Sequence, residues 1–271
     1  MKTRIITGIF LIPLLVGVLC LPVSFMAIAV SLVCIFGIYE FFRATALSDK
    51  KPLCAICYAV TALIPIYAWG GCPYLNTPWA FYAMLYLFGI AVFSVMLACR
   101  EKISVKDAGL AAFGVLYIPA FLSCIVLTRL LENGEYFVWL PFIGAFCTDT
   151  FAYFSGVFFG KHKLCPQISP KKTIEGSVGG TAGCILIVLL FGILLESLFD
   201  VDTSPARLAV LGLLIAIVSQ LGDLTASIIK RTFGIKDYGN LFPGHGGILD
   251  RLDSVIAVSP LVFFFIKLFG V

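Results

Sequence analysis

Long runs of uncharged, mainly apolar residues alternate with short charged segments along this chain. The uncharged runs cover residues 5–39, 52–99, 108–128 and 176–195. A helix needs roughly 20 apolar residues to cross the hydrocarbon core of a bilayer, and turn residues such as Pro22 divide the longer runs. The pattern therefore predicts about nine transmembrane helices, at residues 5–21, 23–42, 53–70, 79–99, 108–128, 136–159, 177–198, 206–230 and 254–270.

The composition agrees with this pattern. Hydrophobic residues make up 61% of the 271 residues and charged residues 13%, whereas a soluble domain carries about 25% charged residues. Lys2 and Arg4 followed by an apolar run are also typical of a signal peptide, but no small-x-small cleavage site precedes Pro22. We therefore predict an all-α, polytopic membrane protein that keeps its first helix, forming one integral-membrane unit with scaffold helices in residues 1–135 and a catalytic region in 136–271.

The basic residues predict the orientation of these helices. With nine spans, all but three of the 19 lysines and arginines fall on one side of the membrane. The exceptions are Arg129, Arg207 and Lys267. Loops rich in Lys and Arg face the cytoplasm, so we expect a cytoplasmic N-terminus and an external C-terminus.

A first group of polar residues lies inside the eighth predicted helix. Ser219, Asp223, Ser227 and Lys230 are spaced so that they share one helical face. A carboxylate within a span costs at least roughly 2.5 kcal/mol and usually marks a functional site. The alternative is a structural Asp223 that is hydrogen-bonded to neighbouring helices.

A second group precedes the last predicted helix, where Gly246 and Gly247 are followed by Asp250, Arg251 and Asp253. The two carboxylates are i, i+3 neighbours and would repel each other by roughly 4 kcal/mol at 4 Å and an effective dielectric constant of 20. A bound divalent cation reverses that repulsion. Helix capping explains one aspartate equally well, but it does not explain the second.

A third group spans the sixth helix and the loop that follows it. Asp149 lies within the predicted span, and Lys171 and Lys172 precede a helix whose first turn we expect at residues 177–180. Free N–H groups at a helix start together with paired lysines favour a phosphate site. The alternative for each lysine is ordinary anchoring on the cytoplasmic side. His162 and His245 have no partner at metal-ligand spacing, and we expect His245 to donate to phosphate or to order its loop.

Acids, basic residues and glycine-rich turns at one membrane face suit phosphoryl or nucleotidyl transfer with Mg²⁺. The chain has no Walker A loop, Rossmann fingerprint or nucleophile elbow. These residues by themselves name neither the nucleotide nor the acceptor.

The segment from Ser227 to Asp253 resembles the signature of the phosphatidate cytidylyltransferases, also called CDP-diacylglycerol synthases. It carries Ser-x2-Lys-Arg-x4-Lys-Asp-x-Gly-x2-Phe-Pro-x-His-Gly-Gly-x2-Asp-Arg-x-Asp. Segments 149–160 and 169–176 also resemble that family, whereas residues 1–140 are similar only in hydropathy. The resemblance implies that CTP and phosphatidic acid form CDP-diacylglycerol and pyrophosphate at the cytoplasmic face of a bacterial inner membrane. It also implies Mg²⁺, a second, potassium-type cation and a homodimer; no nucleic-acid partner is expected.

The resemblance assigns roles to the residues of all three groups. Metal ligands are expected at Asp223 and Asp250, with Asp253 and Asp149 as ligands or neighbours of ligands. The remaining residues are expected to bind the substrate phosphates: Lys171, Lys172, Ser227, Lys230, Arg231, His245, Gly246, Gly247 and Arg251. Two other functions fit the same residues, a CTP-dependent polyisoprenol kinase and a transporter with intramembrane acids. A transporter would more naturally place its acids near the midplane of two related halves, and no such repeat is visible.

Overall fold

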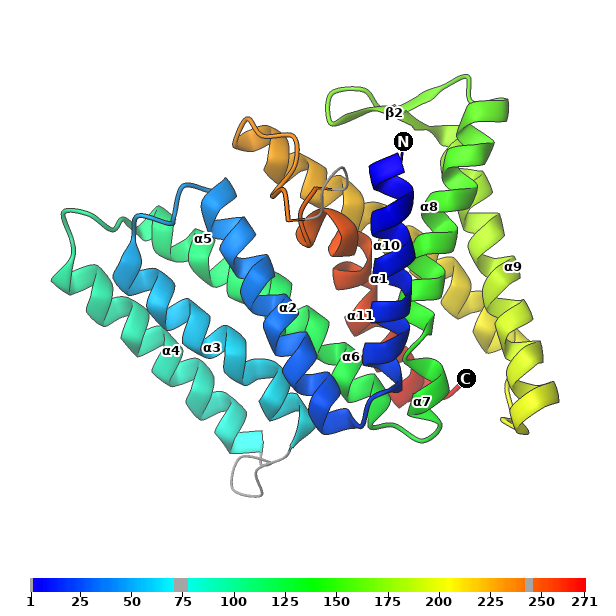
Figure 1. Cartoon of the computed structure of the whole chain (residues 1–271), viewed down its shortest axis with the longest axis horizontal. Helices are drawn as coiled ribbons and strands as arrows, with labels where there is room; N and C mark the ends of the chain where they lie inside the picture. Colours follow the sequence, from blue (N-terminus) through cyan, green and yellow to red (C-terminus); the bar gives the residue numbers. More distant parts are fainter. Residues whose placement is uncertain (1, 71–77, 242–245) are drawn as a thin grey trace. The chain divides into compact units, whose positions relative to one another are not determined.

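The computed structural model describes residues 2–70, 78–241 and 246–271 of the chain. Helices dominate it, with one short hairpin of two strands (Figure 1). The elements are α1 (Lys2–Cys20), α2 (Val23–Ala44), α3 (Lys51–Trp69), α4 (Pro78–Ala98), α5 (Val105–Val115), the π-helical turn η1 (Leu116–Ala120), α6 (Phe121–Arg129), α7 (Gly134–Phe137), α8 (Leu140–Phe159), β1 (Lys163–Cys165), β2 (Ser169–Thr173), α9 (Ile174–Phe199), α10 (Pro205–Thr232) and α11 (Leu249–Phe269).

Every predicted helix is helical in the structure, and most boundaries agree to within three residues. Within the described residues, eight helical segments are long and apolar enough to cross a membrane, and a ninth, shorter apolar segment covers Leu11–Cys20. The fifth span is not a single α-helix, because η1 interrupts it around Pro119, which cannot donate a backbone hydrogen bond. The predicted all-α polytopic membrane fold is confirmed.

The chain divides into two compact units. The first contains Met1–Leu127 together with Ile235–Arg251, and the second contains Thr128–Gly234 together with Leu252–Val271. The units therefore do not follow the order of the chain: most of the signature segment lies in the first unit with the N-terminal helices. Helix α11 begins in the first unit and continues in the second.

In the first unit, α2 packs against α1, α3, α5 and η1. Ile38, Phe41 and Phe42 on this helix are almost fully buried. A side chain at Gly37 would press against Ile118 and Leu249, and one at Gly114 would overlap the ring of Phe41. The absence of side chains at these glycines lets α5, η1 and the start of α11 approach α2 closely.

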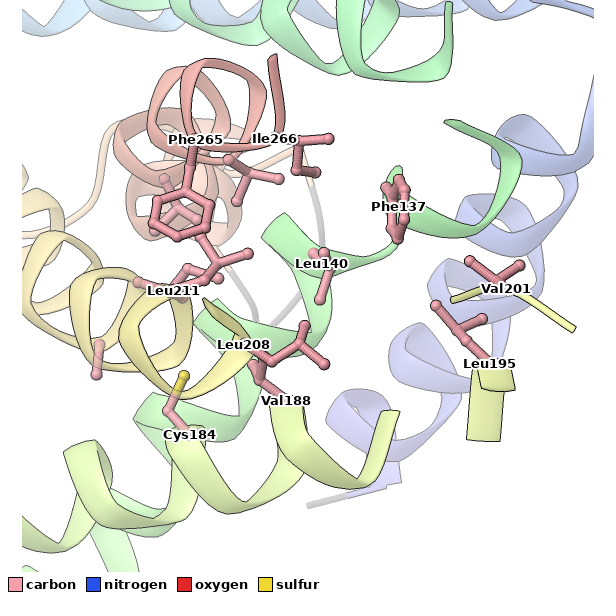
Figure 2. Packing of buried hydrophobic residues seen from close by; sticks show 14 residues of the cluster. Phe137, Leu140, Cys184, Val188, Leu195, Val201, Leu208, Leu211, Phe265 and Ile266 are labelled. Atoms are coloured by element: carbon pink, nitrogen blue, oxygen red, sulfur yellow. The ribbon is translucent and has the colours of Figure 1, made fainter. Parts of the chain in front are cut away.

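In the second unit, buried apolar side chains from α7, α8, α9, α10 and α11 form one cluster (Figure 2). Leu140 of α8, Val188 of α9 and Leu208 and Leu211 of α10 are among its fully enclosed members. This cluster fixes how the helices of the second unit pack, and so it positions the polar residues that these helices carry.

Helices α8 and α9 lie unusually close because small residues line their interface. A Cβ atom at Gly176 or Gly180 would overlap backbone atoms of α8, and one at Gly183 would overlap the ring of Phe151. Close approach through small residues is a common mode of helix packing in membranes. It places the predicted Asp149 of α8 beside the first turns of α9.

Candidate active site

The second unit contains a cavity of about 450 Å³ lined by residues of α8, the β1–β2 hairpin, the start of α9 and α10. Four residues predicted from the sequence line it: Asp149, Lys171, Lys172 and Asp223. The remaining lining residues include Tyr153, Lys163, Ser177 and Gln220. The structure thus brings together acids and lysines that are up to 74 positions apart in the sequence (149 to 223).

The hairpin places the two lysines. Strand β1 pairs antiparallel with β2, and Lys163 lies opposite Thr173. Thr173 then caps α9, since its backbone is extended and its hydroxyl accepts a 3.1 Å hydrogen bond from the Gly176 amide. Helix α9 therefore begins at Ile174. The prediction of a first turn at residues 177–180 is wrong, because the capping threonine starts the helix three residues earlier.

His162 and Glu175 connect the loop before β1 to the first turn of α9. The Nδ1 atom of His162 lies 2.7 Å from Glu175 Oε1, and the backbone N–H of His162 donates to the same carboxylate at 3.2 Å. The Ile174 amide donates to the carbonyl of His162 at 3.0 Å. Sequence reasoning looked for a metal partner of His162 and missed this pair. Together these bonds close the ends of the hairpin that carries Lys171 and Lys172.

Lys172 forms an ion pair with Asp223. Lys172 Nζ lies 2.5 Å from Asp223 Oδ2, and about a quarter of each side chain is exposed. The partner lies on β2 and not on a neighbouring helix, so the functional and the structural interpretations of Asp223 both stay predictions. The same contact places the intramembrane carboxylate on the wall of a cavity that also contains Lys171.

Further charges surround this ion pair. Asp149 interacts electrostatically with Asp223 and Lys172. Asp253, from the part of α11 in the second unit, interacts with Asp223, Lys230 and Asp149. The buried Ser219 hydroxyl, one helical turn before Asp223, has no hydrogen-bond partner among the described residues. Three carboxylates and two lysines thus form one charge cluster, with an unsatisfied hydroxyl on the same helix.

Gln220 supports the neighbouring wall of the cavity. Its amide group donates to the carbonyl of Ala216 at 3.1 Å and to the Thr181 hydroxyl at 3.3 Å, and its side-chain oxygen accepts from Ser177. These bonds join α10 to α9 next to Asp223. Sequence reasoning did not single out Gln220, whose polarity within an apolar helix was the available signal.

The signature residues 246–251 lie in the first unit. Asp250 Oδ2 accepts hydrogen bonds from the amides of Tyr238 at 2.8 Å and Gly247 at 3.0 Å, which secures the turn that contains Gly246. Gly246 has a φ of +83°, a conformation that favours glycine. Asp250 therefore has a structural role beside its predicted role as a metal ligand.

A buried carboxylate that the sequence analysis missed completes this turn. Glu40 of α2 is only 4% exposed. Its two oxygens accept hydrogen bonds from the amides of Ile248 and Leu249, each at 3.0 Å. The only sequence signal was an acid near the C-terminal end of an otherwise apolar helix.

The other predicted site residues that the structure describes do not line the cavity of the second unit. Ser227 and Lys230 are half-buried on α10, whereas Arg231 and Arg251 are exposed. His245 lies outside the described residues. The predicted ligands Asp223 and Asp253 belong to the second unit and Asp250 to the first. Among the residues that the structure covers, no group of three His, Cys, Asp or Glu side chains is placed to hold a metal ion, and the predicted ligand set stays a prediction.

Fold and site together define an integral membrane protein with a charged cavity suited to phosphate chemistry. Comparison with known proteins gives the family. The cytidylyltransferase family matches residues 2–269. The chain belongs to this family and is a nucleotidyltransferase.

Individual relatives agree with this assignment. The chain is 36% identical over 188 residues to the phosphatidate cytidylyltransferase of Bacillus subtilis (strain 168), which covers 67% of this chain and 68% of that protein. It is 41% identical over 173 residues to the phosphatidate cytidylyltransferase of Staphylococcus aureus (strain COL), covering 63% and 64%. The protein of that name from Staphylococcus haemolyticus (strain JCSC1435) is 39% identical over 165 residues, covering 60% of each chain. The matched stretch thus spans slightly less than two thirds of the staphylococcal relatives.

Proposed function

We propose that this chain is a CTP:phosphatidate cytidylyltransferase that forms CDP-diacylglycerol for phospholipid biosynthesis at the cytoplasmic face of the membrane. Family membership and the names of the relatives support the reaction. The structural observation that carries the proposal is the cavity in which Lys171 and Lys172 face the acids Asp149 and Asp223.

In this reaction an oxygen of the phosphatidate headgroup attacks the α-phosphorus of CTP. A bond forms between that oxygen and the α-phosphorus, and the bond between the α-phosphorus and the oxygen bridging to the β-phosphate breaks. Pyrophosphate leaves with the bonding electron pair. The attacking phosphate is already an anion, so the site must mainly position two anionic substrates and reduce the repulsion between them.

The lysines of the hairpin fit this task. Lys171 is exposed at the cavity, and Lys172 is held at a fixed place by Asp223. Lysine is a compact point charge with three donors, which suits phosphate oxygens. Lys230, near Asp253, extends the positive charge along α10. We assign to these residues the binding and orientation of substrate phosphates.

The donor set of the charge cluster fits Mg²⁺. Asp149, Asp223 and Asp253 offer hard carboxylate oxygens, and one or two of them together with substrate phosphates would hold Mg²⁺, which is usually bound in this way rather than by a protein cage. The unsatisfied Ser219 hydroxyl adds a further oxygen close to this group. Bound there, the ion would neutralise charge on the triphosphate. Asp250 stays part of the proposed metal set on the sequence evidence.

The setting of the enzyme completes the proposal. The relatives are bacterial proteins, and the distribution of basic residues favours a site that opens to the cytoplasm from the inner membrane. We also retain the homodimer and the second, potassium-type cation that the family resemblance implies.

A product assay tests this function. Purified protein in mixed micelles with phosphatidic acid and CTP labelled in the cytidine is expected to form a labelled lipid and release pyrophosphate, only when Mg²⁺ is present. Formation of CDP and a newly phosphorylated lipid would instead indicate a kinase. No Mg²⁺-dependent product from phosphatidic acid would overturn the proposal.

A charge-conserving variant tests the cavity itself. Lys172→Arg keeps the positive charge but changes the shape and donor placement of the head group. We expect it to lower turnover much more than the matched control Lys51→Arg, which changes an exposed residue at the start of α3. Near-normal turnover in both Lys171→Arg and Lys172→Arg would remove the hairpin from the specific site and favour simple membrane anchoring.

A further inference from the structure

The start of α11 is held by a side chain from the opposite end of the sequence. Glu40 lies 208 and 209 positions before Ile248 and Leu249, whose amides donate to its two carboxylate oxygens. These amides belong to the N-terminal end of a 21-residue helix, where backbone N–H groups lack partners within the helix. A carboxylate is well suited to this position because the helix dipole is positive there.

Burying a carboxylate is costly unless its oxygens are hydrogen-bonded. Glu40 is 4% exposed, and both of its oxygens are used by the α11 amides. Arg43, one turn further along α2, and Asp250 both interact with it electrostatically. Glu40 therefore occupies a polar position built for a carboxylate at the end of an apolar helix.

Two glycines of the signature segment leave room for this carboxylate. A Cβ atom at Gly239 or at Gly247 would overlap the carboxylate group of Glu40. Neither glycine has a positive φ, so the requirement comes from space and not from backbone conformation. Glu40 thus explains why these two positions carry no side chain.

The same turn holds Asp250. The Gly247 amide, directly before the two amides bound by Glu40, donates to Asp250 Oδ2, as does the Tyr238 amide. Glu40 and Asp250 therefore divide the free amides of residues 247–249 between them. Moving the Glu40 carboxylate would release two of these three amides and disturb the one that orients Asp250.

We propose that Glu40 is a positioning residue of the enzyme, which holds residues 246–251 of the signature segment in the conformation that orients Asp250. It touches no substrate in this role and acts through the backbone of the α11 start. The N-terminal helices thereby take a direct part in organising the signature segment. The expected loss of turnover in Glu40 variants rests on the proposed function. The expected rise in amide exchange at the start of α11 does not.

Hydrogen–deuterium exchange of the whole protein in detergent tests the positioning role without substrates. Glu40→Gln keeps the size of the side chain but replaces one acceptor oxygen with a donor, which faces an amide N–H. We expect exchange of the amides in 246–251 to rise at least ~10-fold, with exchange in α9 unchanged. Glu101→Gln, at an exposed glutamate outside the helices, is the control and should leave both segments unchanged. Unchanged exchange in 246–251, or a rise throughout the protein, would overturn the inference.

Turnover provides the second readout. We expect Glu40→Gln to lower kcat for CDP-diacylglycerol formation at least ~10-fold with a smaller change in KM for CTP, and Glu40→Asp to recover part of the loss because it keeps the charge. A wild-type protein without this activity would refute the proposed function but leave the exchange result intact. Altered exchange with an unchanged kcat would refute the positioning role.

A double-mutant cycle tests the steric part of the argument. Gly239→Ala should impair turnover in the wild type, because the added methyl group overlaps the Glu40 carboxylate. In a Glu40→Ala background that overlap is gone, so we expect Gly239→Ala to cost less than about a further two-fold there. Equal losses in the two backgrounds would show that Gly239 and Glu40 act independently and would overturn the inference.

Discussion

Removing both members of the Lys172–Asp223 pair should destabilise the protein by less than the sum of the two single removals. The two side chains meet at 2.5 Å, and each is about one quarter exposed. Losing one partner of a buried pair costs about 3–5 kcal/mol, whereas exposed pairs contribute about 0.2–1 kcal/mol. For this half-buried pair we expect a loss of about 1–3 kcal/mol for Lys172→Met and less for Asp223→Asn, which leaves an ammonium that can reach solvent.

The double variant Lys172→Met/Asp223→Asn removes both charges of the pair, so neither is left without the other. Its loss of stability should therefore be smaller than the sum of the single losses, with a coupling free energy of about 1–2 kcal/mol. Heating the detergent-purified variants and measuring the remaining folded protein by size-exclusion chromatography reports the midpoint of unfolding. A loss of 1 kcal/mol corresponds to roughly 2–4 °C in a protein of this size.

Lys171 provides the control, because it lies next to Lys172 on β2 and is exposed. Lys171→Met should change stability by no more than about 0.5 kcal/mol. If the two single losses at Lys172 and Asp223 simply add in the double variant to within about 0.5 kcal/mol, the ion pair does not operate in the folded protein and the reasoning fails.

Three further predictions concern topology, the metal site and helix packing. A reporter fused after Val271 should be extracytoplasmic and one inserted at 165–167 cytoplasmic; both on one side would contradict the nine-helix topology. Asp223→Asn and Asp250→Asn should each abolish most turnover of a protein that still inserts into the membrane. The double variant should lose little more activity, because the two residues act as a unit. A double loss equal to the product of the single losses would indicate independent roles. Gly183→Val should destabilise the protein by about 1–3 kcal/mol, since its side chain would overlap the ring of Phe151; an unchanged melting midpoint would show that α8 and α9 separate easily.

The sequence by itself determined the membrane character and the approximate limits of the long helices. Length and apolarity of a segment are local properties, so the runs between charged loops located these helices, but they did not predict the π-helical turn η1 or the early start of α9. The sequence also identified Asp149, Lys171, Lys172 and Asp223, because polar residues inside or beside an apolar span stand out from their neighbours. The motif around Asp250 identified the family for a similar reason: its residues are close together in the chain.

Only the tertiary structure decided which of these residues meet. The pairing of Lys172 with Asp223 and of His162 with Glu175 depends on the hairpin and on the close packing of α8, α9 and α10. The bond of Glu40 to the start of α11 joins segments about 208 positions apart. Hydropathy marks Glu40 only as one acid at a helix end. Its partners follow from how the helices pack, since helix packing depends on the shapes of many side chains from distant parts of the chain and not on any local pattern.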